Sequence, residues 1–137
     1  MITAVTMVKE AFLVAIGGAA GALARFGVGL LVSRLPGRPM PLATLAVNVA
    51  GCLAIGMVGQ YLAGHSSSAV APALRYGVVI GFLGALTTFS AFGWDSVELM
   101  QKGHSGLALA NIGANVVVGL LAVWAGMSIV GQGSRLP

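Results

Sequence analysis

The feature that most constrains this chain is a series of four long apolar stretches separated by short segments that hold most of its polar residues. A helix of about 20 apolar residues crosses the hydrocarbon core of a bilayer. The stretches at about residues 7–32, 42–63, 73–99 and 107–130 therefore predict four transmembrane helices. We expect an all-α integral membrane protein that forms a single four-helix membrane domain over residues 1–137.

The composition supports helices in a bilayer over the competing classes. Only 7% of the residues are charged and 58% are hydrophobic, whereas about 25% of the residues of an ordinary soluble domain are charged. The 21 glycines favour helices that approach closely through small residues. The apolar stretches lack the alternation of apolar and polar residues that strands of a membrane β-barrel require.

The basic residues give little preference for one orientation in the membrane. In the expected topology three lie toward one face and three toward the other, namely Lys9, Arg75 and Arg135 against Arg34, Arg38 and Lys102. Orientation follows an excess of Lys and Arg in cytoplasmic loops, so this balance permits insertion both ways and an antiparallel dimer. The alternative is that other features set one orientation. The basic residues lie near the ends of the apolar stretches, where they suit contact with lipid headgroups and do not indicate nucleic-acid binding.

Polar residues inside the apolar stretches are the candidates for a functional site, because they are costly in a bilayer and usually face a cavity or a partner. They are Arg25, Thr44, Asn48, Thr87, Thr88, Ser90, Asp95, Ser96, Glu98, Asn111 and Asn115. Thr44 and Asn48 are four residues apart, as are Asn111 and Asn115, so each pair shares one helix face. Spacing alone leaves open whether these pairs line a pore or join helices by hydrogen bonds.

The densest signal lies at residues 81–92, where glycines adjoin a cluster of threonine, serine and phenylalanine. One interpretation is a broken helix whose free carbonyls meet a small cation, and the other is a continuous helix that packs through its glycines. Phe89 and Phe92 share one side of a helix. Core packing is their ordinary role, but ring edges carry partial positive charge and can line an anion path that amide and hydroxyl donors complete.

No catalytic machinery is evident. His65 and His104 lie in different expected loops, and the sequence has neither a metal-ligand cluster nor a phosphate-binding glycine loop with its lysine. We therefore expect that the protein is not an enzyme.

Four motifs, in order along almost the whole chain, resemble those of the Fluc fluoride channels, also called the CrcB family. Residues 17–26 resemble the opening Gly-Gly-x-x-Gly-Ala-x-x-Arg-aromatic pattern, and residues 44–51 resemble Thr-x-x-Val-Asn-x-x-Gly of the second helix. Residues 81–92 contain the third-helix pattern Gly-x-x-Thr-Thr-Phe-Ser-x-Phe, which is the most specific of the set. Residues 119–126 match the fourth helix more loosely.

The resemblance implies a multi-pass channel of the bacterial inner membrane that lets fluoride leave the cell passively. It implies an antiparallel, dual-topology homodimer with a broken third helix and two pores along the subunit interface. It also implies a structural Na+ at the dimer centre, held by the backbone carbonyls of Gly84 and Thr87. Carried over by motif, the residues of the fluoride pore are Arg25, Asn48, Thr88, Phe89, Ser90, Phe92 and Asn115.

The chain also departs from the family's pattern. Ala91 follows the third-helix serine where the family often has threonine, and Asp95 takes the place of a common glutamate. Asn111 and Asn115 stand where the fourth helix often has tyrosine and serine, so the polar track there is altered. Arg25 has a second interpretation as an ion-pair partner of Asp95 or Glu98.

Two alternative functions remain open from the sequence. A small multidrug exporter also has four helices, but it needs a titratable carboxylate in its membrane cavity, and Glu10 lies near the end of its stretch. A subunit that is active only beside a non-identical partner is the other alternative.

Overall fold

The computed structural model describes residues 4–36 and 41–133, so Arg38 and Arg135 of the charge argument lie outside the described residues. Every regular element in these ranges is helical, which confirms the predicted class. In chain order the elements are α1 (Ala4–Ser33), α2 (Leu42–Gly64), the π-helical segment η1 (Ala73–Leu83), α3 (Gly84–Leu86), α4 (Phe89–Gln101), α5 (Ser105–Gly113), the π-helical segment η2 (Ala114–Val118) and α6 (Gly119–Gly133).

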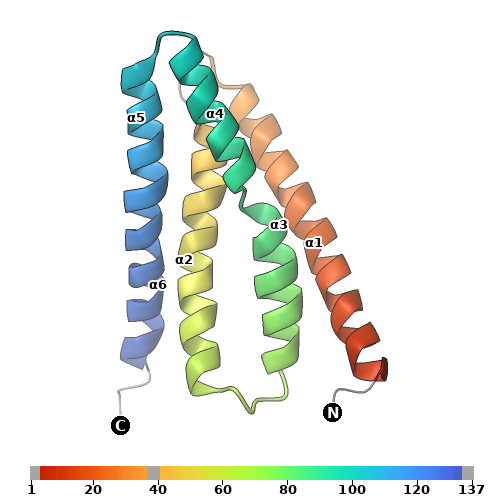
Figure 1. The fold of residues 1–137 in the computed structure, drawn as a ribbon. Helices are drawn as coiled ribbons and strands as arrows, with labels where there is room; N and C mark the ends of the chain where they lie inside the picture. The colour runs from red at the N-terminus through yellow and green to blue at the C-terminus, as the bar shows by residue number, and fades with distance from the viewer. Residues whose placement is uncertain (1–3, 37–40, 134–137) are drawn as a thin grey trace.

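These elements form four helical spans that are long and apolar enough to cross a membrane, as predicted. The third span contains η1, α3 and α4, and the fourth contains α5, η2 and α6. At 30 residues α1 is about 45 Å long, which exceeds the roughly 30 Å of a hydrocarbon core. It leans away from α2, as Figure 1 shows.

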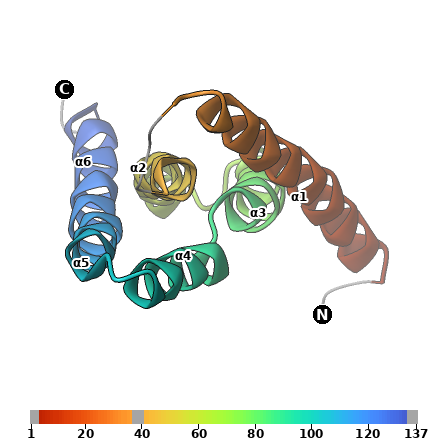
Figure 2. The same cartoon turned by 90° about the horizontal axis from the view of Figure 1, so that it is seen from above.

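The third span changes its neighbours along its length. Its first part, η1 and α3, packs against α1, whereas α4 packs against α5. α2 lies between these groups and packs mainly against α6. Seen from above, α4 turns away from α3 toward α5 (Figure 2). The break in the third span therefore links the two sides of the bundle.

Glycines set the contact between α1 and η1. A side chain at Gly17 would collide with the carbonyl oxygen of Gly77, and one at Gly21 would collide with that of Phe82. The two helices thus touch backbone to backbone, which is how small residues bring membrane helices together. The α2–α6 contact uses the same device, because a side chain at Gly56 would meet the Val123 carbonyl oxygen.

A tight corner joins α4 to α5. Gly103 has φ +78°, in the left-handed region that glycine adopts without steric cost. The His104 N–H donates to the Leu99 carbonyl at 2.9 Å, and the Gly103 N–H donates to the Met100 carbonyl at 3.0 Å. This pair of bonds is the Schellman ending of a helix, and it holds α5 beside α4.

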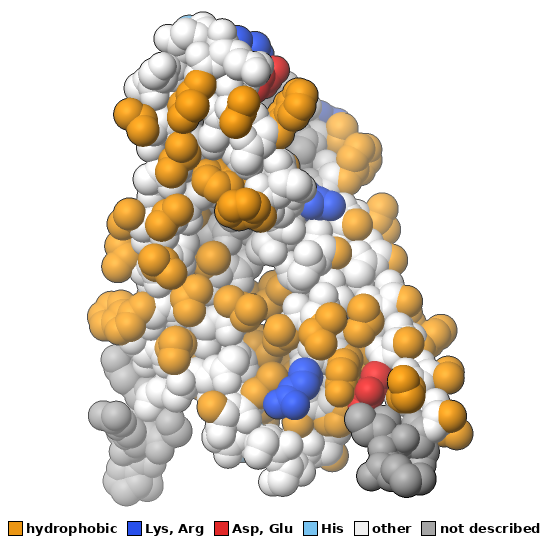
Figure 3. Space-filling view, viewed as in Figure 1, with side chains coloured by type: hydrophobic (Ala, Val, Ile, Leu, Met, Phe, Trp, Pro, Cys, Tyr) orange, Lys and Arg blue, Asp and Glu red, His pale blue; other side chains and the backbone are white. Residues whose placement is uncertain are grey.

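Exposed large apolar side chains occur on all four spans, and Figure 3 shows apolar side chains spread over the length of one face. Charged side chains take up only small patches of that face. In water such a surface would be unstable, whereas in a bilayer it is the expected one.

Candidate functional site

The third span is interrupted at Thr87 and Thr88, which confirms the broken-helix interpretation. Both residues have extended backbone, with φ/ψ of −80°/153° at Thr87 and −151°/114° at Thr88. The Thr88 N–H donates to Asn48 Oδ1 at 2.8 Å, and Asn48 Nδ2 donates back to the Thr88 carbonyl at 3.3 Å. A single side chain of α2 thus satisfies both backbone groups of Thr88, so the break is part of the fold.

The break leaves carbonyls of α3 without their helical donors. In a continuous helix the Thr88 N–H would bond to the Gly84 carbonyl, but it donates to Asn48. The Ala91 N–H, which would bond to the Thr87 carbonyl, instead donates to Thr88 Oγ1 at 3.2 Å. The carbonyls of Gly84 and Thr87 are therefore available to another ligand, and oxygen ligands suit a hard cation.

The predicted amide stripes of the second and fourth spans meet each other. Asn48 Nδ2 donates to Asn115 Oδ1 at 2.9 Å, and Asn115 Nδ2 donates to Asn111 Oδ1 at 3.1 Å and to the Asn111 carbonyl at 3.0 Å. Asn115 lies in η2, whereas Asn111 lies in α5. Asn48 is thus the point where α2, the break and the fourth span are joined.

A groove of about 350 Å³ opens beside this network. Its walls come from α2, η1, α3, α4 and η2, and its lining residues are Asn48, Gly51, Cys52, Ile55, Val79, Leu83, Gly84, Thr87, Phe89, Phe92, Asn115 and Val116. A side chain at Gly51 would collide with the Thr87 methyl group, so Gly51 makes room for the break. The groove is largely apolar, with a few polar groups at the break.

The predicted aromatic pair lies on the wall of this groove. The ring centroids of Phe89 and Phe92 are 5.4 Å apart and the rings are tilted by 59°. Phe89 is 83% exposed in the single chain, which is far more than a packing role within this chain would leave. Ser90 follows it and shares a 3.2 Å hydrogen bond with Thr88 Oγ1.

A second cavity, of about 250 Å³, lies where α1, α2 and α4 meet. Arg25 and Thr44 line it, together with Thr88 from the break. The cationic guanidinium of Arg25 is the group in this cavity that can attract an anion. Arg25 is thus placed apart from the groove that holds Phe89, although the break borders both cavities, the groove through Thr87 and the second cavity through Thr88.

The two acids of α4, Asp95 and Glu98, were considered as ion-pair partners of Arg25, but each of them bonds to another residue. Thr44 Oγ1 donates to Asp95 Oδ2 at 2.7 Å. Glu98 pairs with Lys102 at 2.9 Å, one helical turn away. Between the side chains that the structure describes, no ion pair within 4.0 Å joins Arg25 to either acid.

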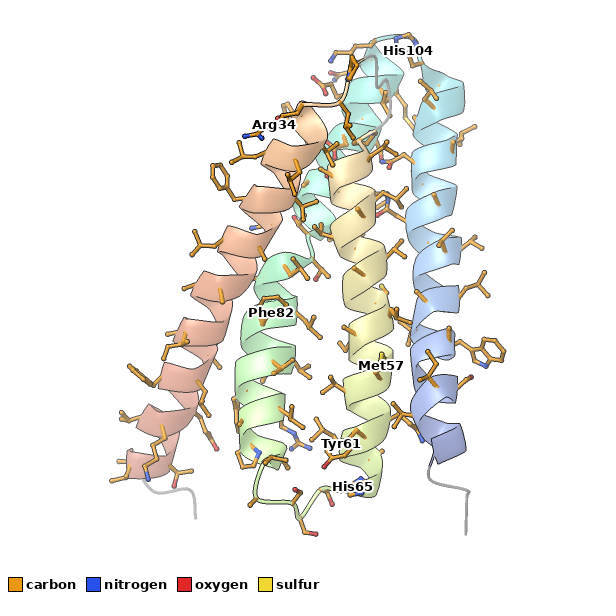
Figure 4. The ribbon with its side chains drawn as sticks, turned by 180° about the vertical axis from the view of Figure 1, so that it is seen from behind. Arg34, Met57, Tyr61, His65, Phe82 and His104 are labelled. Atoms are coloured by element: carbon orange, nitrogen blue, oxygen red, sulfur yellow. The ribbon has the colours of Figure 1, made fainter. Side chains whose placement is uncertain are left out.

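The histidines lie at the two ends of the bundle, away from the groove. Figure 4 shows His65 beside Tyr61 at the end of α2, and His104 with Arg34 at the opposite end. The His65 ring stacks on the Tyr61 ring with centroids 4.4 Å apart. Neither histidine lines the two cavities described above.

Two contacts of the site were missed by reasoning from sequence. Asn111 Nδ2 donates to Ser96 Oγ at 2.9 Å, and Thr44 donates to Asp95. Each of these residues was recognised as a polar residue in a span. Which of them pair depends on the rotation and tilt of helices far apart in the chain, and spacing within one helix carries no signal of that.

Comparison with known proteins identifies relatives of this chain. The family described as "CrcB-like protein, Camphor Resistance (CrcB)" matches residues 12–127. A fluoride-specific ion channel FluC from Stutzerimonas stutzeri is 45% identical over 123 residues, covering 90% of this chain and 98% of the relative. One from Paracoccus denitrificans is 46% identical over 127 residues, covering 91% and 97%. One from Acidobacterium capsulatum is 41% identical over 116 residues, covering 85% and 91%.

Proposed function

The chain belongs to the CrcB family, and from that premise we propose that it is a fluoride-selective channel that lets fluoride cross a membrane passively. The observation that carries the proposal is the identity of 41–46% with fluoride-specific ion channels over most of both chains. The four apolar spans make the protein a multi-pass membrane protein. We assign it to the bacterial inner membrane, where passive conduction lowers cytoplasmic fluoride.

The groove beside the break supports a path for an anion. Fluoride is small and strongly hydrated, so a path must replace its water with donors while avoiding a full charge that would trap it. Phe89 and Phe92 offer ring edges with partial positive charge on the groove wall. The Thr88 and Ser90 hydroxyls bond to each other at the break, and the amides of Asn48 and Asn115 border the groove.

Arg25 suits a role in collecting anions before they enter the path. It lines the second cavity with Thr44, and its guanidinium stays charged at any physiological pH. A cation near the entrance raises the local concentration of anions, and the effect weakens with ionic strength. We therefore assign Arg25 to the vestibule of the same path.

The carbonyls of Gly84 and Thr87 are proposed to hold a structural Na+. Their helical donors bond elsewhere, and Gly84 is exposed in the single chain, so a second subunit can contribute to the same site. A bound Na+ would fix the break and neutralise the carbonyl dipoles. Thermal unfolding in detergent should therefore occur at lower temperature when N-methyl-D-glucamine replaces Na+. Identical unfolding temperatures would remove the ion from the proposal.

We propose that two copies assemble antiparallel. The weak charge bias permits insertion in both orientations, and Phe89, which is mostly exposed on the groove wall, gains cover from a second subunit. Light scattering of the purified protein would give the mass of two chains. Residues accessible to a membrane-impermeant label from both sides of intact cells would establish dual topology.

Flux from liposomes tests the function. We would load liposomes that contain the purified protein with potassium fluoride, dissipate the potassium gradient with valinomycin, and follow fluoride release with an electrode. We expect rapid release of fluoride and slow release of chloride. Phe92→Ile, which keeps an apolar side chain but removes the ring edge, should slow fluoride release by tenfold or more, on the order expected for a group at the conduction path.

The control is Phe12→Ile, which changes an exposed phenylalanine of α1 that lines neither cavity. Its fluoride release should equal that of the wild type. If release requires a proton gradient, the multidrug-type exporter is the better function. Absence of release from monodisperse wild-type protein would indicate a subunit that needs a non-identical partner, or a different function.

A further inference from the structure

The hydrogen bonds of the site form one directed chain that starts at Thr88, the N-cap of α4, and ends at Phe92 within α4. The Thr88 N–H donates to Asn48, Asn48 donates to Asn115, and Asn115 donates to Asn111. Asn111 then donates to Ser96 Oγ, and the Ser96 hydroxyl donates to the Phe92 carbonyl at 2.8 Å. Each amide accepts through its oxygen and donates through its nitrogen, an arrangement in which neighbouring bonds polarise and strengthen one another.

This chain of bonds, which we call the amide relay (Thr88, Asn48, Asn115, Asn111, Ser96), brackets the helical turns that carry the aromatic pair. Thr88 caps the start of α4, and Ser96 lies on the turn after Phe92. Phe89 and Phe92 stand between these two anchor points. The relay therefore fixes both ends of the segment that presents the rings to the groove.

Asn111 is the innermost member of the relay. Its relative exposure is 0%, and it is the largest fully buried side chain among the described residues. It is absent from the lining of the groove, whereas Asn48 and Asn115 are part of that lining. An amide buried at this depth is costly unless it is fully bonded, and its bonds run to α4 on one side and to Asn115 on the other.

We propose that Asn111 is a positioning residue for anion conduction: it does not touch the ion but sets the orientation of the Asn115 and Asn48 amides and of the Phe92 turn. The inference rests on the proposed channel function and deepens it. Without Asn111, Asn115 loses its side-chain acceptor and Ser96 loses its donor. The Asn115 amide then keeps only the Asn111 backbone carbonyl as its acceptor, and the Asn48 amide and the Phe92 turn are held less firmly in the geometry that lines the groove.

The test compares fluoride release from liposomes for the wild type, Asn111→Leu, Asn115→Leu and the double variant. Leucine has the same number and branching of side-chain heavy atoms as asparagine, so the change removes the bonds while keeping the branched shape, although its methyl groups take more room. We expect Asn111→Leu to slow fluoride release about tenfold, the factor that corresponds to one or two lost hydrogen bonds. In the Asn115→Leu background the same change should slow release by only about threefold, because the branch through Asn115 is already lost and only the branch through Ser96 remains to be removed.

A purely structural role predicts a different pattern. The factors by which the two substitutions slow fluoride release would multiply in the double variant, and the loss of flux would follow the loss of thermal stability. That pattern would overturn the inference, as would an Asn111→Leu protein that releases fluoride at the wild-type rate. Gln60→Leu, which removes an amide from α2 outside the relay, is the control and should conduct as the wild type does. If wild-type liposomes release no fluoride, the proposed function fails, and this inference fails with it.

Ser96→Ala keeps the test decisive if Asn111→Leu does not yield folded protein. It removes one hydroxyl from a buried position and cuts the relay at its last link. We expect it to slow fluoride release about threefold, since a weaker hydroxyl link is lost while Asn111 and Asn115 remain bonded. Release at the wild-type rate from Ser96→Ala would overturn the inference.

Discussion

The two parts of the third span are held in place in different ways. η1 and α3 meet α1 through glycines, where backbone touches backbone. α4 is held by side-chain hydrogen bonds from α2 and α5. The contact with α1 requires that the glycines have no side chains, whereas the contacts of α4 require side chains that donate hydrogen bonds. The same span therefore has one part that cannot accept larger residues and another that cannot lose polar ones.

The largest effect is expected from adding volume to the glycine contact. Gly21→Leu would drive a side chain into the Phe82 carbonyl, and backbone atoms have little room to move away. We expect a loss of more than about 4 kcal/mol, enough to prevent a stable fold. Size-exclusion chromatography in detergent would show little or no monodisperse protein.

The matched control is Gly27→Ala in the same helix, where an added Cβ meets nothing within 4 Å. It should behave as the wild type or be slightly more stable, because alanine favours the helix. A monodisperse Gly21→Leu protein with unchanged unfolding temperature would contradict the view that this contact excludes volume.

The next largest effect is expected from removing the donor and acceptor at the centre of the polar contact. Asn48→Leu leaves the Thr88 N–H without its acceptor and breaks the bond to Asn115. We expect a loss of about 2–3 kcal/mol in the free energy of unfolding, since a buried donor is left unsatisfied. Intrinsic tryptophan fluorescence during thermal unfolding would measure it. The comparison fails if Asn48→Leu is as stable as Gln60→Leu.

A smaller effect is expected at the Thr44–Asp95 hydrogen bond. Thr44→Val keeps the shape of the side chain but removes the hydroxyl that donates to Asp95 Oδ2 at 2.7 Å. A bond to a charged group contributes about 1.5–3 kcal/mol, and partial burial places this one at the lower end. We expect the unfolding temperature to fall by several degrees. Asp95→Asn, which can still accept this bond, should lose less, and the reverse order would argue against the hydrogen bond as the cause.

The smallest effect is expected at the surface ion pair of α4. Lys102→Gln removes the partner of Glu98, but the two side chains are 60% and 43% exposed. Exposed pairs one turn apart contribute only about 0.3–0.5 kcal/mol. The unfolding temperature should stay within about a degree of the wild type, and added salt should reduce this small difference because it screens exposed charges. A large shift would mean that charge at this end of α4 contributes to the polar contact.

The sequence predicted the parts of the fold that depend on local pattern. Four apolar stretches predicted the four spans. The glycines beside threonines left a broken and a continuous third helix open, the family resemblance implied the broken one, and the structure places the break at Thr87 and Thr88. The close helix contacts were also expected from the many glycines, because small residues let two helix backbones approach each other. The π-helical segments η1 and η2 were not predicted, since they differ from α-helix only in the register of backbone bonds.

The candidate site was predictable residue by residue, but its connections were not. Asn48 and Asn115 were candidates from their spacing, yet their hydrogen bond joins residues 67 apart in the chain. Whether two stripes face each other depends on the tilt and rotation of both helices, which packing sets. Asn111 and Ser96 illustrate the same limit, because each is an ordinary polar residue until α5 lies against α4.

The corner at Gly103 bears on the order in which the protein can assemble. Because it turns α5 back beside α4, the Ser96–Asn111 bond closes over only 15 residues, whereas Asn48–Thr88 closes over 40 and Thr44–Asp95 over 51. The entropic cost of closing a loop grows with its length. Of these three connections, the one within the α4–α5 hairpin therefore has the lowest entropic cost of closure, and the hairpin can form before α2 docks on it.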